Sequence, residues 1–309
     1  MTASKRPLVA VIATGGTIAS ERGADGASLP SLGGDSLLNC LPDIGVRLKA
    51  IDLMARDSAS LTLSDMQTIS STVAKFLADP AIDGIVVVHG TDAMEETSLL
   101  VQLQNVLTKP VIFTGAQFTA DHPRADGPAN LAAAVSAATE FGNSGRGVLV
   151  CFGGATYPAW GLYKHSATDT DAFRQSRTEE NPAFHCPGNV DHLRIDILAV
   201  YPGCDGVLVD AGIAAGANGI VLAALGSGNA TPEIVGAVRR CLEKGIPVVI
   251  SSRVPQGTLA PSYGGGGGGH DLVQAGAIHS ANLRPGQARI LLAAMLSSQN
   301  TDRLGETFA

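Results

Sequence analysis

Short apolar runs alternate with amphipathic stretches along most of the 309-residue chain. Some runs, such as GIVVV at 84–88 and GVLVCF at 147–152, are apolar at nearly every position. Continuous apolar runs of this length are typical of strands that are buried on both faces of a parallel sheet. We therefore predict strands at 8–13, 46–53, 84–88, 110–114, 147–152, 193–200, 219–225 and 246–251.

The stretches between these runs carry apolar residues at helical spacing. Over 64–78 the apolar stripe follows Ser64 and Gln67, which fit a capping box, and over 232–244 it follows Thr231 as a cap. Strands that alternate with helices predict an α/β fold. We expect two domains joined by a linker, each a mainly parallel sheet flanked by helices.

A polar, turn-rich stretch between about 153 and 192 interrupts the α/β pattern. We place the domain boundary there, so that a larger N-terminal domain covers 1–190 and a smaller C-terminal domain covers 191–309. Three segments that lack periodicity are expected to be mobile. They are the loop 20–35, the loop 115–127 and the six consecutive glycines at 264–269.

Composition and charge exclude several classes of protein. A hydrophobic fraction of 45% excludes a disordered chain. The net charge is −7 and no basic patch is visible, so we expect no nucleic-acid partner. No apolar run reaches the ~20 residues that span a bilayer, so we expect no membrane partner. The run at 8–13 follows Lys5 and Arg6 but lacks a cleavage site, which favours a strand over a secretion signal.

The cysteines form no CxxC pair and no Cys/His cluster at zinc spacing, so we expect no metal site. Free, mostly buried thiols are typical of a reducing compartment, and we therefore expect a cytoplasmic protein. The five positions are Cys40, Cys151, Cys186, Cys204 and Cys241.

The first predicted strand runs into Gly15, Gly16 and Thr17. Two glycines allow the backbone to turn sharply, and the carboxyl edge of an open α/β sheet is where ligands bind. A nucleotide cradle is weakly supported, because neither GxGxxG nor GxxxxGK[ST] occurs here. On spacing alone, a turn that merely starts a helix remains an alternative interpretation.

A second strand, 84–88, ends in His89, Gly90, Thr91 and Asp92, and a helix is expected over 93–106. This motif again brings a hydroxyl and a carboxylate to a strand's carboxyl edge. Asp92 with Glu95 also fits an N-cap and its partner, a purely structural role. His89 has no second ligand at metal spacing, which favours a core or supporting histidine.

A threonine hydroxyl becomes a useful nucleophile only with a base in hydrogen-bond reach. Lysine serves as that base where burial lowers its pKa. Lys164 lies in the aromatic, otherwise uncharged stretch YPAWGLYKHS and is the candidate, with a solvated lysine as the alternative. Small polar or backbone groups also follow other strands, at Ser58, Ala116 and Asn229.

Together these motifs resemble those of the bacterial-type L-asparaginase/glutaminase amidohydrolases. The two family signatures correspond to ATGGTIA at 13–19 and HGTDAMEET at 89–97. The resemblance covers nearly the whole chain in the family's order. It continues through TGAQ at 114–117, DGPANL at 126–131, GLYKHS at 161–166, GSGN at 226–229 and SSRVPQG at 251–257.

The resemblance implies a threonine mechanism for the hydrolysis of asparagine to aspartate and ammonia, with weak glutaminase activity beside it. Thr17 would attack the side-chain amide carbon and form a covalent acyl-enzyme that water then hydrolyses. Lys164 would take the proton of Thr91, and Asp92 would orient Lys164 and bind the substrate's α-amino group. The resemblance implies no cofactor and no metal.

The same resemblance implies a substrate pocket within the larger domain, with 20–35 as its mobile lid. Ser58 would bind the α-carboxylate, and backbone groups near Gly16, Gly90 and Ala116 would complete the pocket. Asn229 of the smaller domain matches a position that reaches into a neighbouring subunit's site. The protein would therefore be a homo-oligomer, either a dimer or a dimer-of-dimers tetramer.

The chain departs from the family pattern at three places that affect substrate recognition. The lid usually carries a tyrosine whose hydroxyl contacts the nucleophile, whereas Ser28 is the hydroxyl residue in the matching neighbourhood. Secreted members place a glutamate after the RVP segment, whereas 260–269 contains no carboxylate. Ala59 stands where glutamine is frequent. These departures concern substrate preference and rate more than the reaction class.

Two other functions are compatible with parts of this pattern. An amino-acid sensor would keep the pocket and lose efficient catalysis, and the missing tyrosine and glutamate favour it slightly. The amidase subunit of a tRNA-dependent amidotransferase has a similar catalytic domain. That subunit is expected to carry an additional N-terminal domain and a basic surface for tRNA, whereas this chain is acidic and its first strand begins near residue 8.

Overall fold

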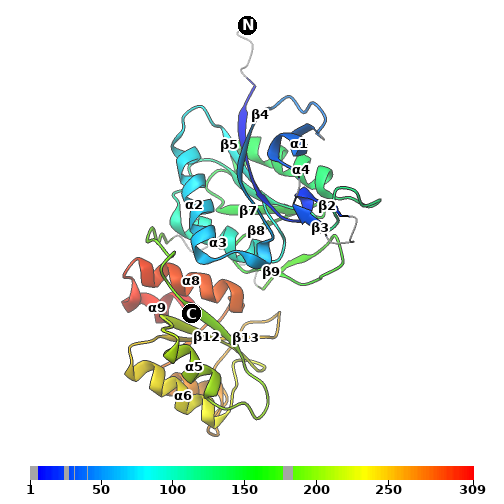
Figure 1. Ribbon diagram of the computed structural model, residues 1–309. Coiled ribbons are helices and arrows are strands. Elements are labelled where there is room, and N and C mark those ends of the chain that lie inside the picture. Colours follow the sequence, from blue (N-terminus) through cyan, green and yellow to red (C-terminus); the bar gives the residue numbers. More distant parts are fainter. Residues whose placement is uncertain (1–5, 24–27, 31, 40, 177–183) are drawn as a thin grey trace. The chain divides into compact units, whose positions relative to one another are not determined.

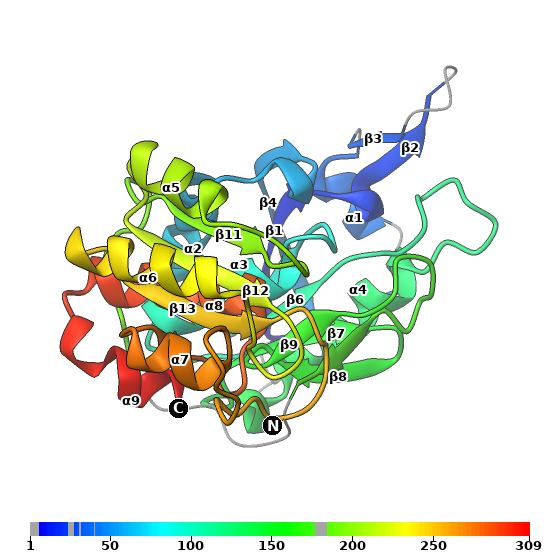
Figure 2. The same ribbon diagram turned by 90° about the horizontal axis from the view of Figure 1, so that it is seen from below.

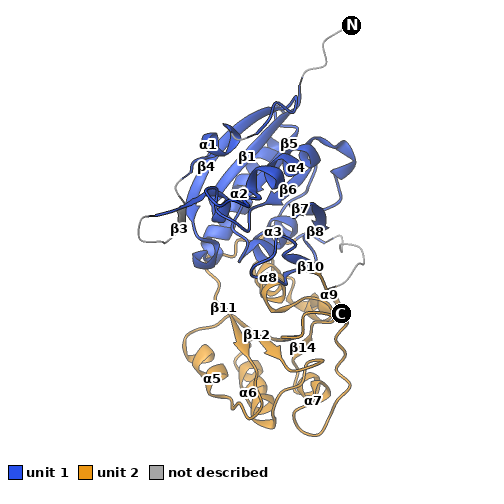
Figure 3. Ribbon diagram, turned by 90° about the vertical axis from the view of Figure 1, so that its right-hand side faces the viewer, with its two compact units in different colours: residues 1–174, 181–185 blue, residues 175–180, 186–309 orange. Residues whose placement is uncertain are grey.

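The computed structural model describes residues 6–23, 28–30, 32–39, 41–176 and 184–309 (Figure 1). The chain forms two compact units (Figure 3). Unit 1 contains Met1–Arg174 and Asn181–His185, and unit 2 contains Gln175–Glu180 and Cys186–Ala309. Each unit has its own parallel or mainly parallel sheet with flanking helices, so the predicted α/β fold class is confirmed.

Unit 1 is built on a six-stranded sheet in the order β4-β1-β5-β6-β7-β8. Neighbouring strands are parallel except for β7 and β8, which are antiparallel. The predicted apolar runs of this unit all became strands of this sheet. The strands are β1 (Leu8–Gly15), β4 (Arg47–Arg56), β5 (Gly84–Val88), β6 (Val111–Thr114), β7 (Val148–Phe152) and β8 (Ala155–Pro158).

Both faces of this sheet are covered, which explains why its central strands are apolar at every position. Ile12 of β1 and Val87 of β5 pack with Ile69 of α2, whereas Val11 and Val86 pack against α4 on the other face. The helices of unit 1 are α1 (Gly34–Asn39), α2 (Leu63–Ala78), α3 (Met94–Gln104) and α4 (Gly127–Thr139).

The start of α2 differs from the expectation. The capping box consists of Thr62 and Asp65, not of Ser64 and Gln67. The Asp65 backbone N–H donates to the Thr62 hydroxyl at 3.2 Å, and the Thr62 N–H donates to the Asp65 carboxylate at 2.9 Å. The pairs Thr62–Asp65 and Ser64–Gln67 have the same spacing, so the sequence does not distinguish them. Burial of Leu63 makes it the first helical residue, and the N-cap is therefore two residues earlier than predicted.

The segment 20–35 also contains short elements that periodicity could not predict. Strands β2 (Ser20–Arg22) and β3 (Ser28–Pro30) form an antiparallel hairpin, and three-residue strands are too short to show a period. Residues 24–27 and 31 lie outside the described part of the chain. Unit 1 further contains the 3₁₀ turns Thr17–Ala19, Ser58–Ser60 and Phe141–Asn143. Strand β9 (Leu162–Lys164) also belongs to unit 1, and β10 (Phe173–Gln175) begins within it.

Unit 2 carries a four-stranded parallel sheet in the order β11-β12-β13-β14. Figure 2 labels the first three of these strands. Its strands are β11 (Ile195–Ala199), β12 (Gly219–Ala224), β13 (Val248–Ser252) and β14 (Ile278–His279). Its helices are α5 (Val207–Ala214), α6 (Pro232–Glu243), α7 (Gly269–Gln274), α8 (Pro285–Ser297) and α9 (Leu304–Phe308). Thr231 caps α6 as predicted, because its hydroxyl accepts the Ile234 N–H at 3.3 Å.

Within the glycine run at 264–269, the side chain of Asp271 holds part of the backbone. The Asp271 carboxylate accepts the N–H groups of Gly266 at 2.7 Å and Gly268 at 2.9 Å, and α7 begins at Gly269.

Among the described residues, no helix is long and apolar enough to cross a membrane.

Candidate active site

The first candidate residue, Thr17, follows a turn that only glycine can make. Gly15 and Gly16 have φ values of 101° and 82°, which favour glycine. A Cβ on Gly16 would lie 2.5 Å from the Cα and the nitrogen of Gly90. The Gly16 N–H donates to the Arg56 carbonyl at 3.1 Å, so the turn is also fixed to the end of β4. Thr17 is thereby held, half-buried, at the carboxyl end of β1.

Gly90, which packs against Gly16, also packs against Ser58. A Cβ on Gly90 would lie 2.5 Å from the Ser58 hydroxyl oxygen, so the loops after β1, β4 and β5 touch at Gly16, Ser58 and Gly90. Ser58 is buried and starts the 3₁₀ turn, whose cap is Asp57. The three parallel strands end at one edge of the sheet, and their loops meet there as expected for an open α/β sheet.

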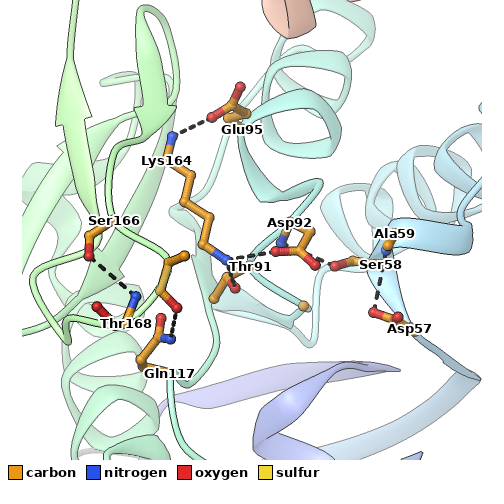
Figure 4. Close-up of polar contacts among 12 residues, drawn as sticks. Asp57, Ser58, Ala59, Thr91, Asp92, Glu95, Gln117, Lys164, Ser166 and Thr168 are labelled. Carbon is orange, nitrogen blue, oxygen red and sulfur yellow. Dashed lines mark hydrogen bonds and ion pairs between the residues drawn. The ribbon is translucent and has the colours of Figure 1, made fainter. Parts of the chain in front are cut away.

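Thr91, Asp92 and Lys164 are joined through one amine (Figure 4). The Lys164 Nζ donates to Thr91 Oγ1 at 2.8 Å and to Asp92 Oδ1 at 2.6 Å. Thr91 is buried, and the side chains of Lys164 and Asp92 are 20% and 55% exposed. Lys164 is therefore not a freely solvated lysine. Its amine lies within the range in which a base activates a hydroxyl.

Asp92 does not cap the helix that follows it. Helix α3 begins at Met94, its N-cap is Ala93, and no side chain caps it. The Asp92 backbone N–H instead donates to the Ser58 hydroxyl at 3.2 Å. The capping interpretation of Asp92 is therefore wrong, because the carboxylate lies beside the lysine amine.

Glu95 lies in the first turn of α3, and the sequence alone indicates only a role as the partner of that cap. In the structure its Oε2 accepts the backbone N–H of Lys164 at 2.5 Å. Burial raises the pKa of Glu95 to about 8, and the neighbouring Glu96 carboxylate adds to the rise. The signal that could have identified it is its place in HGTDAMEET, one helical turn after Thr91 and Asp92.

His89 is fully buried, and its Nδ1 donates to the Gly90 carbonyl at 2.7 Å. Burial lowers its pKa to about 4, so the ring is neutral at physiological pH. His89 therefore supports the loop that carries Thr91. In the described parts of the chain, no group of three or more His, Cys, Asp or Glu side chains could hold a metal ion.

The loop that contains Ala116 is organised by residues of DGPANL. The Asp126 carboxylate accepts the backbone N–H groups of Gln117 and Phe118 at 3.0 Å. The Asn130 amide donates to the Gly115 carbonyl at 3.0 Å. Ala116 is buried, and its loop follows β6, next to β5 in the sheet. Asp126 and Asn130 thus fix the shape of this loop, a role that the motif alone did not specify.

Asn229 belongs to unit 2 and follows β12. Its Oδ1 accepts the Gly269 N–H at 3.1 Å, so this side chain helps to hold the end of the glycine run. Ser28 is the first residue of β3, and its side chain lies outside the described part of the structure. Of the site residues expected from the sequence, unit 1 thus brings together Gly16, Ser58, Gly90, Thr91, Asp92 and Lys164, with Thr17 next to Gly16.

Comparison with known proteins covers almost the whole chain. Residues 8–212 match the family model "Asparaginase, N-terminal", and residues 194–307 match "Glutaminase/Asparaginase C-terminal domain".

Three relatives illustrate the similarity. A "Probable L-asparaginase" of Deinococcus radiodurans is 34% identical over 94% of this chain and 93% of its own length. "L-asparaginase 2" of Bacillus subtilis is 28% identical over 95% and 84%. A "Probable L-asparaginase periplasmic" of Haemophilus influenzae is 29% identical over 94% and 88%.

Proposed function

This chain belongs to the asparaginase family of amidohydrolases, and from that premise we propose that it hydrolyses L-asparagine to L-aspartate and ammonia through a threonine nucleophile. The observation that carries the proposal is the Lys164 amine, which lies 2.8 Å from Thr91 Oγ1 and 2.6 Å from Asp92 Oδ1. A hydroxyl, a base and a carboxylate in hydrogen-bond contact are the parts of an activated nucleophile.

In the proposed reaction, the Thr17 hydroxyl oxygen attacks the side-chain amide carbon of asparagine. The carbon–nitrogen bond breaks, the proton from Thr17 goes to the leaving nitrogen, and ammonia departs. Water then cleaves the ester, which regenerates Thr17 and releases aspartate. Two such steps replace one difficult hydrolysis.

Thr91 supplies the second hydroxyl of this site. With its amine uncharged, Lys164 accepts the Thr91 proton through the same 2.8 Å contact. The Thr91 oxygen can then take a proton from the attacking water, and Asp92 keeps the amine in place through Oδ1. General base help of this kind contributes about 10²–10⁴-fold to a rate.

Substrate recognition in the proposal uses the groups around Gly16 and Gly90. The Ser58 hydroxyl and nearby backbone groups bind the α-carboxylate, and Asp92 binds the α-ammonium group. The exposed side chain of Asp92 supports this assignment, since its Oδ1 contacts Lys164 while the carboxylate stays accessible. Backbone groups at Ala116 contact the side-chain amide. Glutamine is a second, weaker substrate.

The proposal also covers the oligomeric state of the protein and its location in the cell. Asn229 contributes to the site of a neighbouring subunit in a homo-oligomer, a dimer or a dimer-of-dimers tetramer. This part is supported by the match of GSGN to the family pattern. Residence in the reducing cytoplasm is supported by four free and buried thiols, at Cys151, Cys186, Cys204 and Cys241. Light scattering of the purified full chain tests the oligomeric state.

A coupled assay for ammonia tests the proposed reaction. The purified protein should release ammonia from L-asparagine, more slowly from L-glutamine, and far more slowly from the D-forms of both. Binding of L-asparagine measured by calorimetry without release of ammonia would identify the sensor instead and overturn the proposal.

A further inference from the structure

Glu95 and Lys164 lie 69 residues apart in the chain and meet at the backbone of the lysine. The Lys164 N–H donates to Glu95 Oε2 at 2.5 Å. Lys164 is the last residue of β9, and Glu95 is in the first turn of α3. Figure 4 shows the lysine extended between two anchors, with its backbone nitrogen at Glu95 and its amine at Thr91 and Asp92.

Both anchors of the lysine come from one short segment of the chain. Thr91 and Asp92 follow β5, and Glu95 lies one helical turn further on. A lysine side chain has four rotatable carbon–carbon bonds, so the place of its amine depends on where its backbone is fixed. The contact with Glu95 ties that backbone to the same segment that carries both partners of the amine.

We propose that Glu95 is a positioning residue, whose carboxyl group holds the backbone of Lys164 so that its amine reaches Thr91 Oγ1. This inference rests on the proposed function, in which Lys164 acts on Thr91. Displacement of a catalytic group by ~1 Å can cost about 10²-fold in rate, so a backbone anchor of this kind affects turnover.

The electrostatics of the site fit this role. A carboxyl group removed from water is costly unless it is hydrogen-bonded, and the Lys164 N–H provides such a bond. Because burial raises the pKa of Glu95 to about 8, its carboxyl group is mostly neutral below that pH. A neutral Glu95 accepts the backbone N–H and leaves Asp92 as the carboxylate partner of the Lys164 amine.

Kinetics of three variants of the full chain test the proposal. Glu95→Gln keeps a side-chain oxygen that can accept the N–H, whereas Glu95→Met has similar size and no such acceptor. Glu243→Gln, at an exposed glutamate that ends α6, is the matched control. We expect kcat for ammonia release to fall about 10–100-fold in Glu95→Met, with KM within about threefold, and to stay within about threefold of wild type in the two glutamine variants. Equal losses in Glu95→Gln and Glu95→Met would overturn the acceptor role, and so would an unchanged kcat in Glu95→Met.

Crystal structures separate this inference from the proposed function. We expect the Lys164 Nζ–Thr91 Oγ1 contact to persist in Glu95→Gln and to be lost in Glu95→Met, whether or not the wild type is an asparaginase. An intact contact in Glu95→Met overturns the positioning role. Absence of ammonia release by the wild type overturns the proposed function alone. If Glu95→Met does not fold, Glu95→Ala serves for both measurements.

Discussion

Gly16 and Gly90 pack backbone against backbone, since a Cβ on Gly16 would lie 2.5 Å from both the Cα and the nitrogen of Gly90. Each glycine directly precedes one of the two threonines assigned to the reaction, Thr17 and Thr91. This contact therefore fixes the distance between the two motifs. A side chain at Gly16 would push them apart, and a side chain at Gly90 would collide with Ser58.

Gly90→Ala is expected to destabilise the fold by about 1–3 kcal/mol, because its Cβ would lie 2.5 Å from the Ser58 hydroxyl oxygen. We expect kcat to fall about 10²-fold or more as Thr91 shifts. Thermal unfolding and ammonia release measure the two effects. Gly142→Ala is the control, since a Cβ there meets nothing within 4 Å. Equal stability and equal kcat in Gly90→Ala and Gly142→Ala would contradict the close contact at Gly90.

Thr17→Ala and Thr91→Val should each suppress ammonia release from asparagine by about three orders of magnitude or more, because each removes a hydroxyl assigned to the reaction. Steady-state kinetics measure the loss. Thr68→Val, an exposed position in α2, is the control and should keep the wild-type rate. A threonine whose variant turns over at nearly the wild-type rate has no part in the mechanism.

Ser28→Ala is expected to lower kcat by about tenfold, the effect of one lost hydrogen bond to a charged or reacting group. The reason comes from the sequence, where Ser28 occupies the neighbourhood of the lid tyrosine of related enzymes. Ser64→Ala, at an exposed position of α2, provides the comparison. An unchanged kcat in Ser28→Ala would mean that water or another group supplies the hydroxyl.

The raised pKa of Glu95 should appear in the dependence of stability on pH. Between its ordinary value of 4.5 and about 8, the native state holds a proton that the unfolded state has lost. The contribution of Glu95 to stability is therefore complete below pH 4.5 and is lost as pH rises through 8. The slope is at most about 1.4 kcal/mol per pH unit.

Glu95→Gln removes this titration. The free energy of unfolding of the wild type should therefore fall more steeply between pH 5.5 and 8 (about the range of the shift) than that of the variant. Urea unfolding at several pH values measures both slopes. Parallel slopes in the two proteins would refute a raised pKa at this position.

The sequence could predict those elements whose cause lies in neighbouring residues of the chain. It could not predict features that depend on packing between distant residues. The strands around Val11 and Val87 were predictable, since burial on both faces demands an unbroken apolar run. The start of α2 was misplaced by two residues, because Thr62–Asp65 and Ser64–Gln67 have the same spacing. Only packing of the following residues distinguishes them.

The candidate residues could be named from their motifs, but their contacts could not be predicted from spacing. Lys164 and Thr91 are 73 residues apart, and they meet only because β9 returns to the loop after β5. Asp92 had an equally good local interpretation as a helix cap. The contact of Glu95 with Lys164 could not be predicted, because the partner of Glu95 is a backbone N–H, which leaves no trace in the side-chain pattern.

The most direct test of the account is the rate of ammonia release by Lys164→Met, which keeps the length of the side chain and removes the amine that joins Thr91 and Asp92. The exposed Lys75→Met in α2 is the matched control. We predict that kcat on L-asparagine falls about 10³-fold or more in Lys164→Met and stays within about twofold of wild type in the control. A Lys164→Met enzyme that retains more than about a tenth of the wild-type kcat would contradict the assignment of Lys164 as the base.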